Sequence, residues 1–147
     1  MPILKTGDIW SVPKEEWICI TTNSYIKKNG ALAMGKGIAG EALNRFPALD
    51  DLLGGFIKKN CGHLGFYGIA IVTKYNLVAL QTKYHFKDRS TYELIKKSIC
   101  KLASFHLPGI VNIAFPGIGY GGLDPEIVWK DCLQDLAANN YHIWKKS

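Results

Sequence analysis

Apolar positions along the chain form short continuous runs that are separated by stretches with helical spacing. Runs rich in β-branched residues predict buried strands at 17–22, 68–73, 77–83, 110–115 and 141–144. Tyr75 and Asn76 would turn the second of these strands into the third. Between the runs, apolar residues recur every three to four positions, which predicts helices at about 37–46, 49–59, 91–105 and 125–136.

The expected helix ends are marked by particular residues. Pro47 ends the first helix. Ser90 and Glu93 have the spacing of a capping box, with Ser90 as the N-cap. Asp124 followed by Pro125 is typical of an N-cap and the first helical position. Strands that alternate with helices and have apolar interiors indicate an α/β fold, with helices on both faces of a mixed sheet.

Length and composition fit one intracellular domain. The chain has 147 residues, so we expect a single domain spanning 1–147. Hydrophobic residues (48%) and charged residues (20%) occur at ordinary globular frequencies. No apolar run is long enough for a bilayer, and the first residues do not resemble a signal peptide. We therefore expect a cytoplasmic protein without membrane contact, and a monomer because no segment offers an obvious assembly face.

Charge and cysteine usage narrow the choice of partners. The 18 basic and 12 acidic residues give a formal net charge of +6, which favours nucleic acid or phosphate-bearing ligands. The four cysteines form no C-x-x-C pair, and none of the four histidines has metal-ligand spacing to a cysteine. We predict no metal and no cofactor. Cys19, Cys100 and Cys132 lie in apolar or helical patterns that predict buried, reduced thiols.

Two glycine-rich segments, 30–38 and 116–122, follow predicted strands and lead into helices. Glycine allows backbone N–H groups to approach an anion, and a helix N-terminus adds a favourable dipole. Ligands bind α/β sheets at the carboxyl ends of strands, so two such loops on one edge suit a diphosphate. Either loop by itself could equally be a tight turn.

Neither loop fits the common nucleotide motifs. Residues 30–36 have the glycine spacing and lysine of a Walker A loop, but Gly37 replaces the Ser or Thr that binds Mg²⁺, which argues against an NTPase. Gly117, Gly119 and Gly122 have the spacing of the dinucleotide fingerprint. That loop lies late in the chain, however, and no acidic residue follows at the end of a second strand.

Four segments, 7–9, 21–24, 29–39 and 116–123, resemble motifs of the macrodomain family and occur in the family's order, so that the resemblance spans essentially the whole chain. The resemblance implies a three-layer α/β/α macrodomain fold and a ligand that is ADP-ribose or a derivative. Residues 34–39 are most similar to the branch that contains the terminal ADP-ribose protein glycohydrolase and the antitoxins that remove ADP-ribose from DNA. The triple-glycine stretch that other branches carry after the asparagine is missing, which puts their water-activation route in doubt.

The resemblance also implies which residues bind ADP-ribose. Asp8 would accept a hydrogen bond from the adenine amino group, with the backbone of Ile9 in support. Asn23, beside Thr22, would lie near the distal ribose. The loops that cradle the diphosphate would contribute Gly35, Lys36, Gly37, Ile38, Pro116, Gly117, Ile118, Gly119, Tyr120 and Gly121. Asp8 could instead only close the turn after the first strand, and Asn23 could only cap a strand end.

The same branch implies catalytic roles for Lys83, at a strand end, and Asp124, after the second loop. The Lys83 amine would form a Schiff base with the anomeric carbon of the distal ribose, and Asp124 would act as general base. This requires a lowered lysine pKa. Asp124 could instead be only an N-cap, and Lys83 only a strand-end or phosphate contact. The pair of glycines at 121–122, where the shortest members have one, could shift Asp124 relative to Lys83.

The favoured hypothesis is an ADP-ribosyl glycohydrolase that acts on a modified protein side chain or nucleobase, with nucleic-acid contact through the basic surface. Two alternatives remain open. One is a non-catalytic ADP-ribose reader or scavenger. The other is a hydrolase of small derivatives such as ADP-ribose 1″-phosphate or O-acetyl-ADP-ribose. Tyr84, His85 and Phe86 follow Lys83 and could wall the site, stack on a base, or pack on the domain itself.

Overall fold

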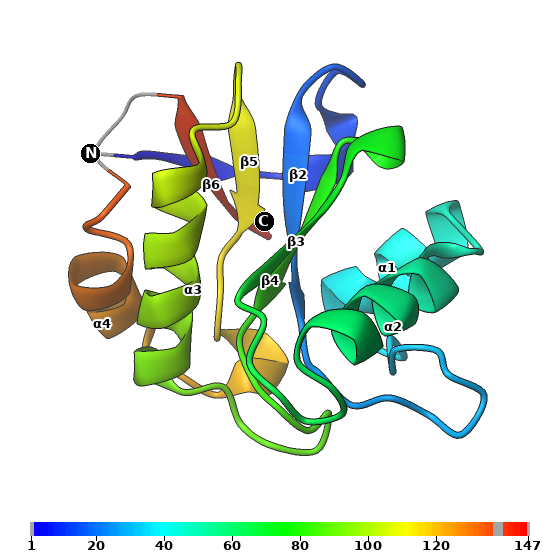
Figure 1. The fold of residues 1–147 in the computed structure, drawn as a ribbon. Helices are drawn as coiled ribbons and strands as arrows, with labels where there is room; N and C mark the ends of the chain where they lie inside the picture. The colour runs from blue at the N-terminus through cyan, green and yellow to red at the C-terminus, as the bar shows by residue number, and fades with distance from the viewer. Residues whose placement is uncertain (1, 137–139, 147) are drawn as a thin grey trace.

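A six-stranded sheet forms the centre of the computed structural model, which describes residues 2–136 and 140–146 (Figure 1). The strand order is β1-β6-β5-β2-β4-β3. Neighbouring strands are parallel except for β3, which pairs antiparallel with β4. The strands are β1 (Ile3–Thr6), β2 (Trp17–Thr22), β3 (Ile69–Val72), β4 (Leu77–Gln81), β5 (Val111–Ala114) and β6 (Tyr141–Lys145).

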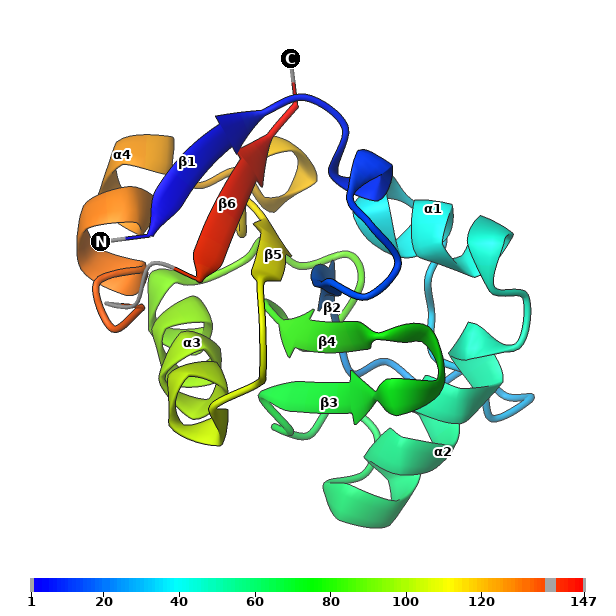
Figure 2. The same ribbon diagram turned by 90° about the horizontal axis from the view of Figure 1, so that it is seen from above.

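Helices cover both faces of the sheet, so the molecule has three layers (Figure 2). The helices α1 (Gly37–Arg45) and α2 (Leu49–Asn60) lie on one face. The other face carries α3 (Tyr92–Phe105) and α4 (Pro125–Ile127), which continues into the π-helical turn η4 (Val128–Cys132). None of the helices in the described ranges is long and apolar enough to cross a membrane. The mixed sheet between two helical layers confirms the predicted fold class.

Two hydrophobic clusters, one on each face of the sheet, form the core. Successive residues of a strand point to opposite faces, so Cys19 packs on the α3 side and Ile20 on the α2 side. Both are fully buried, which explains why β2 reads as a continuous apolar run. Each fully buried aliphatic side chain contributes about 1.5–3 kcal/mol.

The start and the exposed face of α3 differ from the sequence prediction. Thr91, not Ser90, is the N-cap, and its side chain accepts a hydrogen bond from Leu94 N (3.2 Å). Ser90 is buried instead, and its N–H donates to Gly121 O (3.2 Å), so the helix begins one residue later. The prediction that Cys100 is buried is also wrong, because this residue lies beside the apolar stripe of the helix rather than within it and is exposed.

Candidate functional site

Three parallel strands end at the same edge of the sheet, and candidate residues follow each of them. Strand β2 is parallel to both of its neighbours, β4 and β5, so their carboxyl ends share one edge, the lower one in Figure 1. Asn23 follows β2, Lys83 lies two residues beyond β4, and Pro116 lies two residues beyond β5. The fold therefore gathers segments that are far apart in the sequence at one place.

Asn23 ties the first glycine loop to this edge. Its side-chain Nδ2 donates to Ala33 O (3.0 Å), and its Oδ1 accepts from Tyr25 N (2.8 Å). The side chain is buried, with 6% of its surface exposed. Both halves of the amide therefore bond to backbone within the loop, which supports a structural role in addition to the predicted contact with the distal ribose.

The first glycine loop ends at the N-terminus of α1, which has no side-chain cap. Gly35, Lys36 and Gly37 are exposed and Ile38 is half-buried. Lys36 occupies the N-cap position in an extended conformation but makes no capping hydrogen bond with its side chain. The first N–H groups of a helix have no partner within the helix, and here the N-cap side chain does not satisfy them. This end of α1 suits an anion.

The second glycine loop, after β5, curls into the short turn η3 (Gly119–Gly121). The N–H groups of Gly121, Gly122 and Leu123 bond to carbonyls within the loop, at 3.2, 3.2 and 2.8 Å. Among the described residues, no hydrogen bond uses the N–H of Ile118 or Gly119. Two backbone donors therefore remain for a ligand. The side chain of Tyr120 lies outside what the structure describes.

Gly117, in the same loop, occupies a position that strongly favours glycine. Its φ is +79°, and a Cβ there would lie 2.7 Å from both Ile95 Cδ1 and Leu123 Cδ1. Pro116, Gly117 and Gly121 are buried. The base of the loop is therefore packed against α3, which holds the turn η3 in place.

Asp8 and Ile9 lie after β1 and are joined to α1 through Trp10. The Asp8 carboxylate accepts from Trp10 N (3.0 Å), so it closes this turn, and Ile9 is buried. The Trp10 indole N–H donates to Glu41 Oε1 (2.9 Å), and Lys146 Nζ lies 3.0 Å from Glu41 Oε2. Partial burial acts to raise the pKa of Glu41, but these two hydrogen bonds and the positive charge of Lys146 together outweigh it, so the net pKa is lowered.

Lys83 is half-buried beside the end of β2, and its amine donates to Asp88 O (3.2 Å). Burial lowers the pKa of this amine, while the negative charge of Asp88 partly opposes the shift. The neutral fraction of Lys83 at a given pH is therefore larger than that of an ordinary lysine. This is the direction that nucleophilic chemistry requires.

Asp124 caps α4, and no hydrogen bond or ion pair joins it to Lys83 among the described residues. Its carboxylate accepts from Glu126 N (2.9 Å), and its own N–H donates to Tyr92 OH (3.1 Å). Two ion pairs join described residues, Lys130 with Glu126 and Lys146 with Glu41, and Lys83 and Asp124 take part in neither. The segment 88–92 bonds to both regions, since Asp88 O accepts from Lys83 Nζ and Ser90 N donates to Gly121 O.

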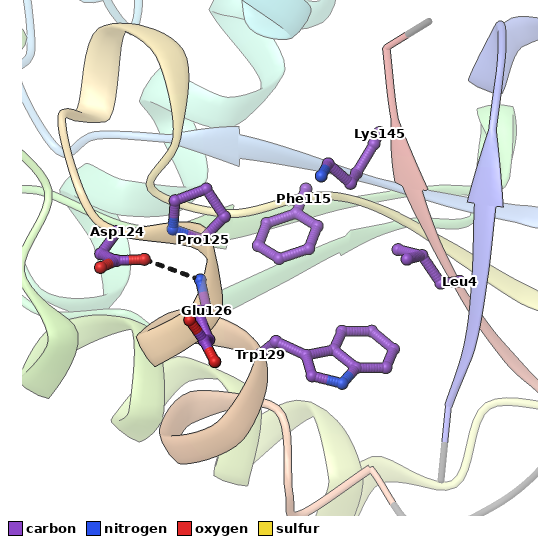
Figure 3. A pocket seen from close by; sticks show the side chains of 7 residues that line it. All are labelled: Leu4, Phe115, Asp124, Pro125, Glu126, Trp129 and Lys145. Atoms are coloured by element: carbon purple, nitrogen blue, oxygen red, sulfur yellow. Dashed lines mark hydrogen bonds between the residues drawn. The ribbon is translucent and has the colours of Figure 1, made fainter.

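Asp124 also lines a pocket of about 400 Å³ on the α4 side of the sheet (Figure 3). The capping hydrogen bond to Glu126 N, drawn as a dashed line, holds its carboxylate at one end of this pocket. The other lining residues are Leu4, Phe115, Pro125, Glu126, Trp129 and Lys145. Neither Lys83 nor the first glycine loop lines the pocket, whereas Phe115 and Asp124 lie on either side of the second loop in the sequence.

Tyr67 belongs to the site but gave no signal in the sequence. Its buried hydroxyl donates to Asn23 O (2.8 Å) and is hydrogen-bonded to Thr22 Oγ1. Thr22, a predicted ligand contact, is itself buried and uses its hydroxyl in this bond. Thr22 and Tyr67 are 45 positions apart, which explains why no local pattern reveals the pair.

An aromatic cluster lies beside Lys83. The ring of Tyr25 contacts those of His63, His85 and Phe86, with centroids 4.7–4.9 Å apart, and 42% of the Phe86 surface is exposed. Both histidines accept a backbone N–H at Nδ1. In the described part of the chain, no three His, Cys, Asp or Glu side chains are grouped so as to hold a metal ion. The segment after Lys83 thus packs on its own domain and leaves part of the Phe86 ring exposed.

Solved structures with the same architecture are macrodomains. The macrodomain of Mycobacterium tuberculosis DarG has a TM-score of 0.77 and 22% identity, and the match covers 100% of this chain and 99% of that one. The macrodomain of Thermus aquaticus DarG has a TM-score of 0.75 and 18% identity, with 100% and 98% covered. Thermosipho africanus DarTG in complex with ADP-ribose has a TM-score of 0.72 and 18% identity, with 99% and 42% covered.

The chain therefore has the macrodomain fold, which confirms the resemblance seen in the sequence. No family model matches the sequence. No curated protein matches it either. The identities to these structures, 18–22%, establish the arrangement of the elements.

Proposed function

We propose that this macrodomain binds ADP-ribose at the carboxyl edge of β2, β4 and β5. Two amide-rich loops support the proposal. The second follows β5 at that edge, and the first is tied to the end of β2 by the Asn23–Ala33 hydrogen bond and leads to the N-terminus of α1, which has no side-chain cap. Backbone N–H groups and a helix dipole together favour a diphosphate. The similar Thermosipho africanus structure was solved with ADP-ribose, which supports the same ligand class.

A diphosphate held by these loops would also determine where the two ends of ADP-ribose bind. Asp8 uses Oδ1 for the N–H of Trp10, which leaves Oδ2 for the adenine amino group. The link from Trp10 to Glu41 holds this turn against α1. The distal ribose would then lie toward Asn23 and Lys83, at the ends of β2 and β4. A net charge of +6 adds a general attraction for the diphosphate.

We further propose that Lys83 makes the protein an ADP-ribosyl glycohydrolase. The neutral amine would attack C1″ of the distal ribose, forming a C–N bond while the bond from C1″ to the carrier breaks and its electron pair leaves with the carrier atom. Water would then add to C1″ and release the amine, giving free ADP-ribose. The lowered pKa of Lys83 supports this role, because only the neutral amine is nucleophilic.

Asp124 would take the proton from the attacking water, as general base. Its capping bond to Glu126 N and the absence of an ion pair with Lys83 among the described residues favour a second candidate, a non-catalytic ADP-ribose reader. In that case Asp124 is only the N-cap of α4. The two functions share the binding site and differ only in turnover.

The aromatic cluster bears on the molecule that carries ADP-ribose. An exposed Phe86 ring beside Lys83, with the Lys87 amine 5.8 Å from its centroid, offers a stacking face next to a cation. Aromatic faces with nearby cations suit unpaired bases. We therefore favour a modified nucleobase over a modified protein side chain, and the assay below includes both.

The test compares Lys83→Ala with Lys74→Ala, which removes an exposed lysine from the turn η2 (Thr73–Tyr75). Calorimetry measures the affinity for ADP-ribose. Release of ADP-ribose from modified protein, modified oligonucleotide and small derivatives measures turnover. We expect Lys83→Ala to bind ADP-ribose as the wild type does and to lose about a hundredfold or more in turnover, with Lys74→Ala unchanged.

Other outcomes distinguish the alternatives. A wild type that binds ADP-ribose but releases it from no substrate favours the reader. Full turnover by Lys83→Ala removes Lys83 from the mechanism, and a wild type without affinity for ADP-ribose contradicts the proposal as a whole. In an active enzyme, the rate should rise with pH through a pKa below the ordinary lysine value of about 10.4, because deprotonation creates the nucleophile.

A further inference from the structure

The turn that carries Lys83 is anchored by two buried polar side chains, Ser24 and Gln81, both with 0% of their surface exposed. The N–H and hydroxyl of Ser24 both donate to Tyr84 O, at 2.9 and 3.3 Å. The Gln81 amide nitrogen donates to Ser24 Oγ (3.2 Å) and to Lys83 O (3.4 Å). Two consecutive carbonyls, of Lys83 and Tyr84, are therefore held by buried donors.

The Gln81 side chain is itself fixed in one orientation. Its Oε1 accepts from both Tyr67 N (2.9 Å) and Gly68 N (3.1 Å). Its Nε2 has two N–H donors, which Gly65 O (3.0 Å), Ser24 Oγ and Lys83 O share. A flipped amide would place its NH₂ group against two N–H donors and its oxygen against a carbonyl. The network therefore determines which end of the amide faces Lys83.

These contacts connect the two halves of the candidate site. Asn23 holds the first glycine loop through Ala33, and the next residue, Ser24, holds the Lys83 turn through Tyr84. Through this pair of neighbouring residues, the end of β2 sets the distance between the diphosphate loop and the lysine. A displacement of about 1 Å in such a geometry can cost on the order of a hundredfold in rate.

We propose that Ser24 and Gln81 are positioning residues that hold the Lys83 amine at the carboxyl edge, within reach of the distal ribose. The inference rests on the proposed function for its effect on rate. It also makes a prediction about the lysine itself. A turn released from Ser24 and Gln81 lets the amine move toward water, so its pKa rises toward that of an exposed lysine.

The primary test is Ser24→Ala, with Ser98→Ala as a matched control. Ser98 is also fully buried, and its hydroxyl donates to a single backbone carbonyl, Gln81 O (2.7 Å), on the α3 side of β4. Both changes remove one buried hydroxyl, but Ser24 bonds the Lys83 turn directly through Tyr84 O, whereas Ser98 bonds only the backbone of β4 at Gln81. Gln81→Glu is the second variant, because it keeps the acceptor for Tyr67 and Gly68 and loses both donors.

We expect Ser24→Ala to lower kcat about ten- to a hundredfold while the Kd for ADP-ribose stays within about twofold. Ser98→Ala should leave both kcat and Kd within about twofold of the wild type. Equal effects of the two serine changes on kcat would overturn the proposal, because loss of a buried hydroxyl alone would then explain them. If Ser24→Ala does not fold, Gln81→Glu takes its place in the test, and the same result is expected: a lower kcat with little change in the Kd for ADP-ribose.

An NMR titration of ¹³Cε-labelled lysines separates this inference from the proposed function. The Lys83 signal is assigned with Lys83→Arg. In the wild type it should titrate below the other lysines, and in Ser24→Ala but not Ser98→Ala it should move toward them. If the wild type has no hydrolase activity, this shift still supports the positioning role while the proposed reaction fails. An unchanged Lys83 titration in Ser24→Ala and in Gln81→Glu overturns the positioning role.

Discussion

Replacing Asn23 with aspartate tests whether this residue holds the first glycine loop or only contacts a ligand. The carboxylate can still accept from Tyr25 N, but it cannot donate to Ala33 O. A buried acceptor without its donor costs about 1–3 kcal/mol. The side chain is only 6% exposed, so an ionised carboxylate there also loses most of its hydration.

The Asn23→Asp variant can also keep the hydrogen bond by holding a proton, and the free energy of that protonation sets an upper limit on the loss of stability. A protonated carboxyl group at this position can donate to Ala33 O and restore the bond. Holding that proton at pH 7, about 3 units above the ordinary aspartate pKa, costs about 4 kcal/mol, and at pH 5 about 1.5 kcal/mol. The folded variant then binds more protons than its unfolded chain, so its stability falls as pH rises, by up to about 1.4 kcal/mol per unit.

Urea unfolding of wild type and variant at pH 5, 6 and 7 measures this loss, and calorimetry measures the affinity for ADP-ribose. Asn29→Asp is the matched control, because Asn29 is exposed in the same loop and its side-chain oxygen only accepts, from Ala31 N (3.0 Å). We expect the control to change stability by less than about 0.5 kcal/mol. An Asn23→Asp protein that is as stable as the control at pH 7, yet binds ADP-ribose far more weakly, would refute the structural role.

Two further predictions concern packing and charge. Gly117→Ala should lower the free energy of unfolding in urea by about 2–4 kcal/mol, because a Cβ would lie 2.7 Å from Ile95 and Leu123 and φ is +79°. Gly35→Ala is the control and should change this free energy little, because nothing lies within 4 Å of a Cβ there. Equal losses of stability in the two variants would contradict the packing argument. The pKa of Glu41 is lower in the folded protein than in the unfolded chain, where it is about 4.3, so the ionised side chain stabilises the fold above that pH. This contribution to stability is lost as the pH falls through the pKa of the folded protein. Wild type should therefore lose more stability than Glu41→Gln between about pH 6 and 3 in urea unfolding, and parallel curves would show that the contacts of Glu41 do not stabilise the fold.

Much of the fold could be predicted from the sequence because its signals are local. The apolar run at 17–22 and the dipeptide Asp124-Pro125 each act within a few residues, and the structure has β2 and the start of α4 there. The capping pattern at Ser90 misleads because the contact of this residue with Gly121 joins residues 31 positions apart, and tertiary packing outweighs the local pattern.

The candidate site could be predicted only in part, because contacts between residues far apart in the sequence hold it together. The two glycine loops are visible as composition, but the contacts that hold them are not. Gln81 appears in the sequence as one more residue of a strand, although its side chain joins Tyr67, Ser24 and Lys83. The segment 88–92 bonds to Lys83 through Asp88 and to Asp124 through Tyr92, and no local pattern encodes its path.

The place of β6 in the sheet bears on when the protein becomes functional during synthesis. β6 is the last strand in chain order, yet it lies between β5 and β1. Until residues 141–145 have left the ribosome, the first strand has no partner in the sheet and the Asp8 turn cannot reach its final position. Pairings of such large sequence separation also slow folding. If the proposed site binds ADP-ribose, a nascent chain should acquire this affinity only once β6 has paired, so capture on immobilised ADP-ribose would report chains that contain β6 in the sheet rather than shorter intermediates.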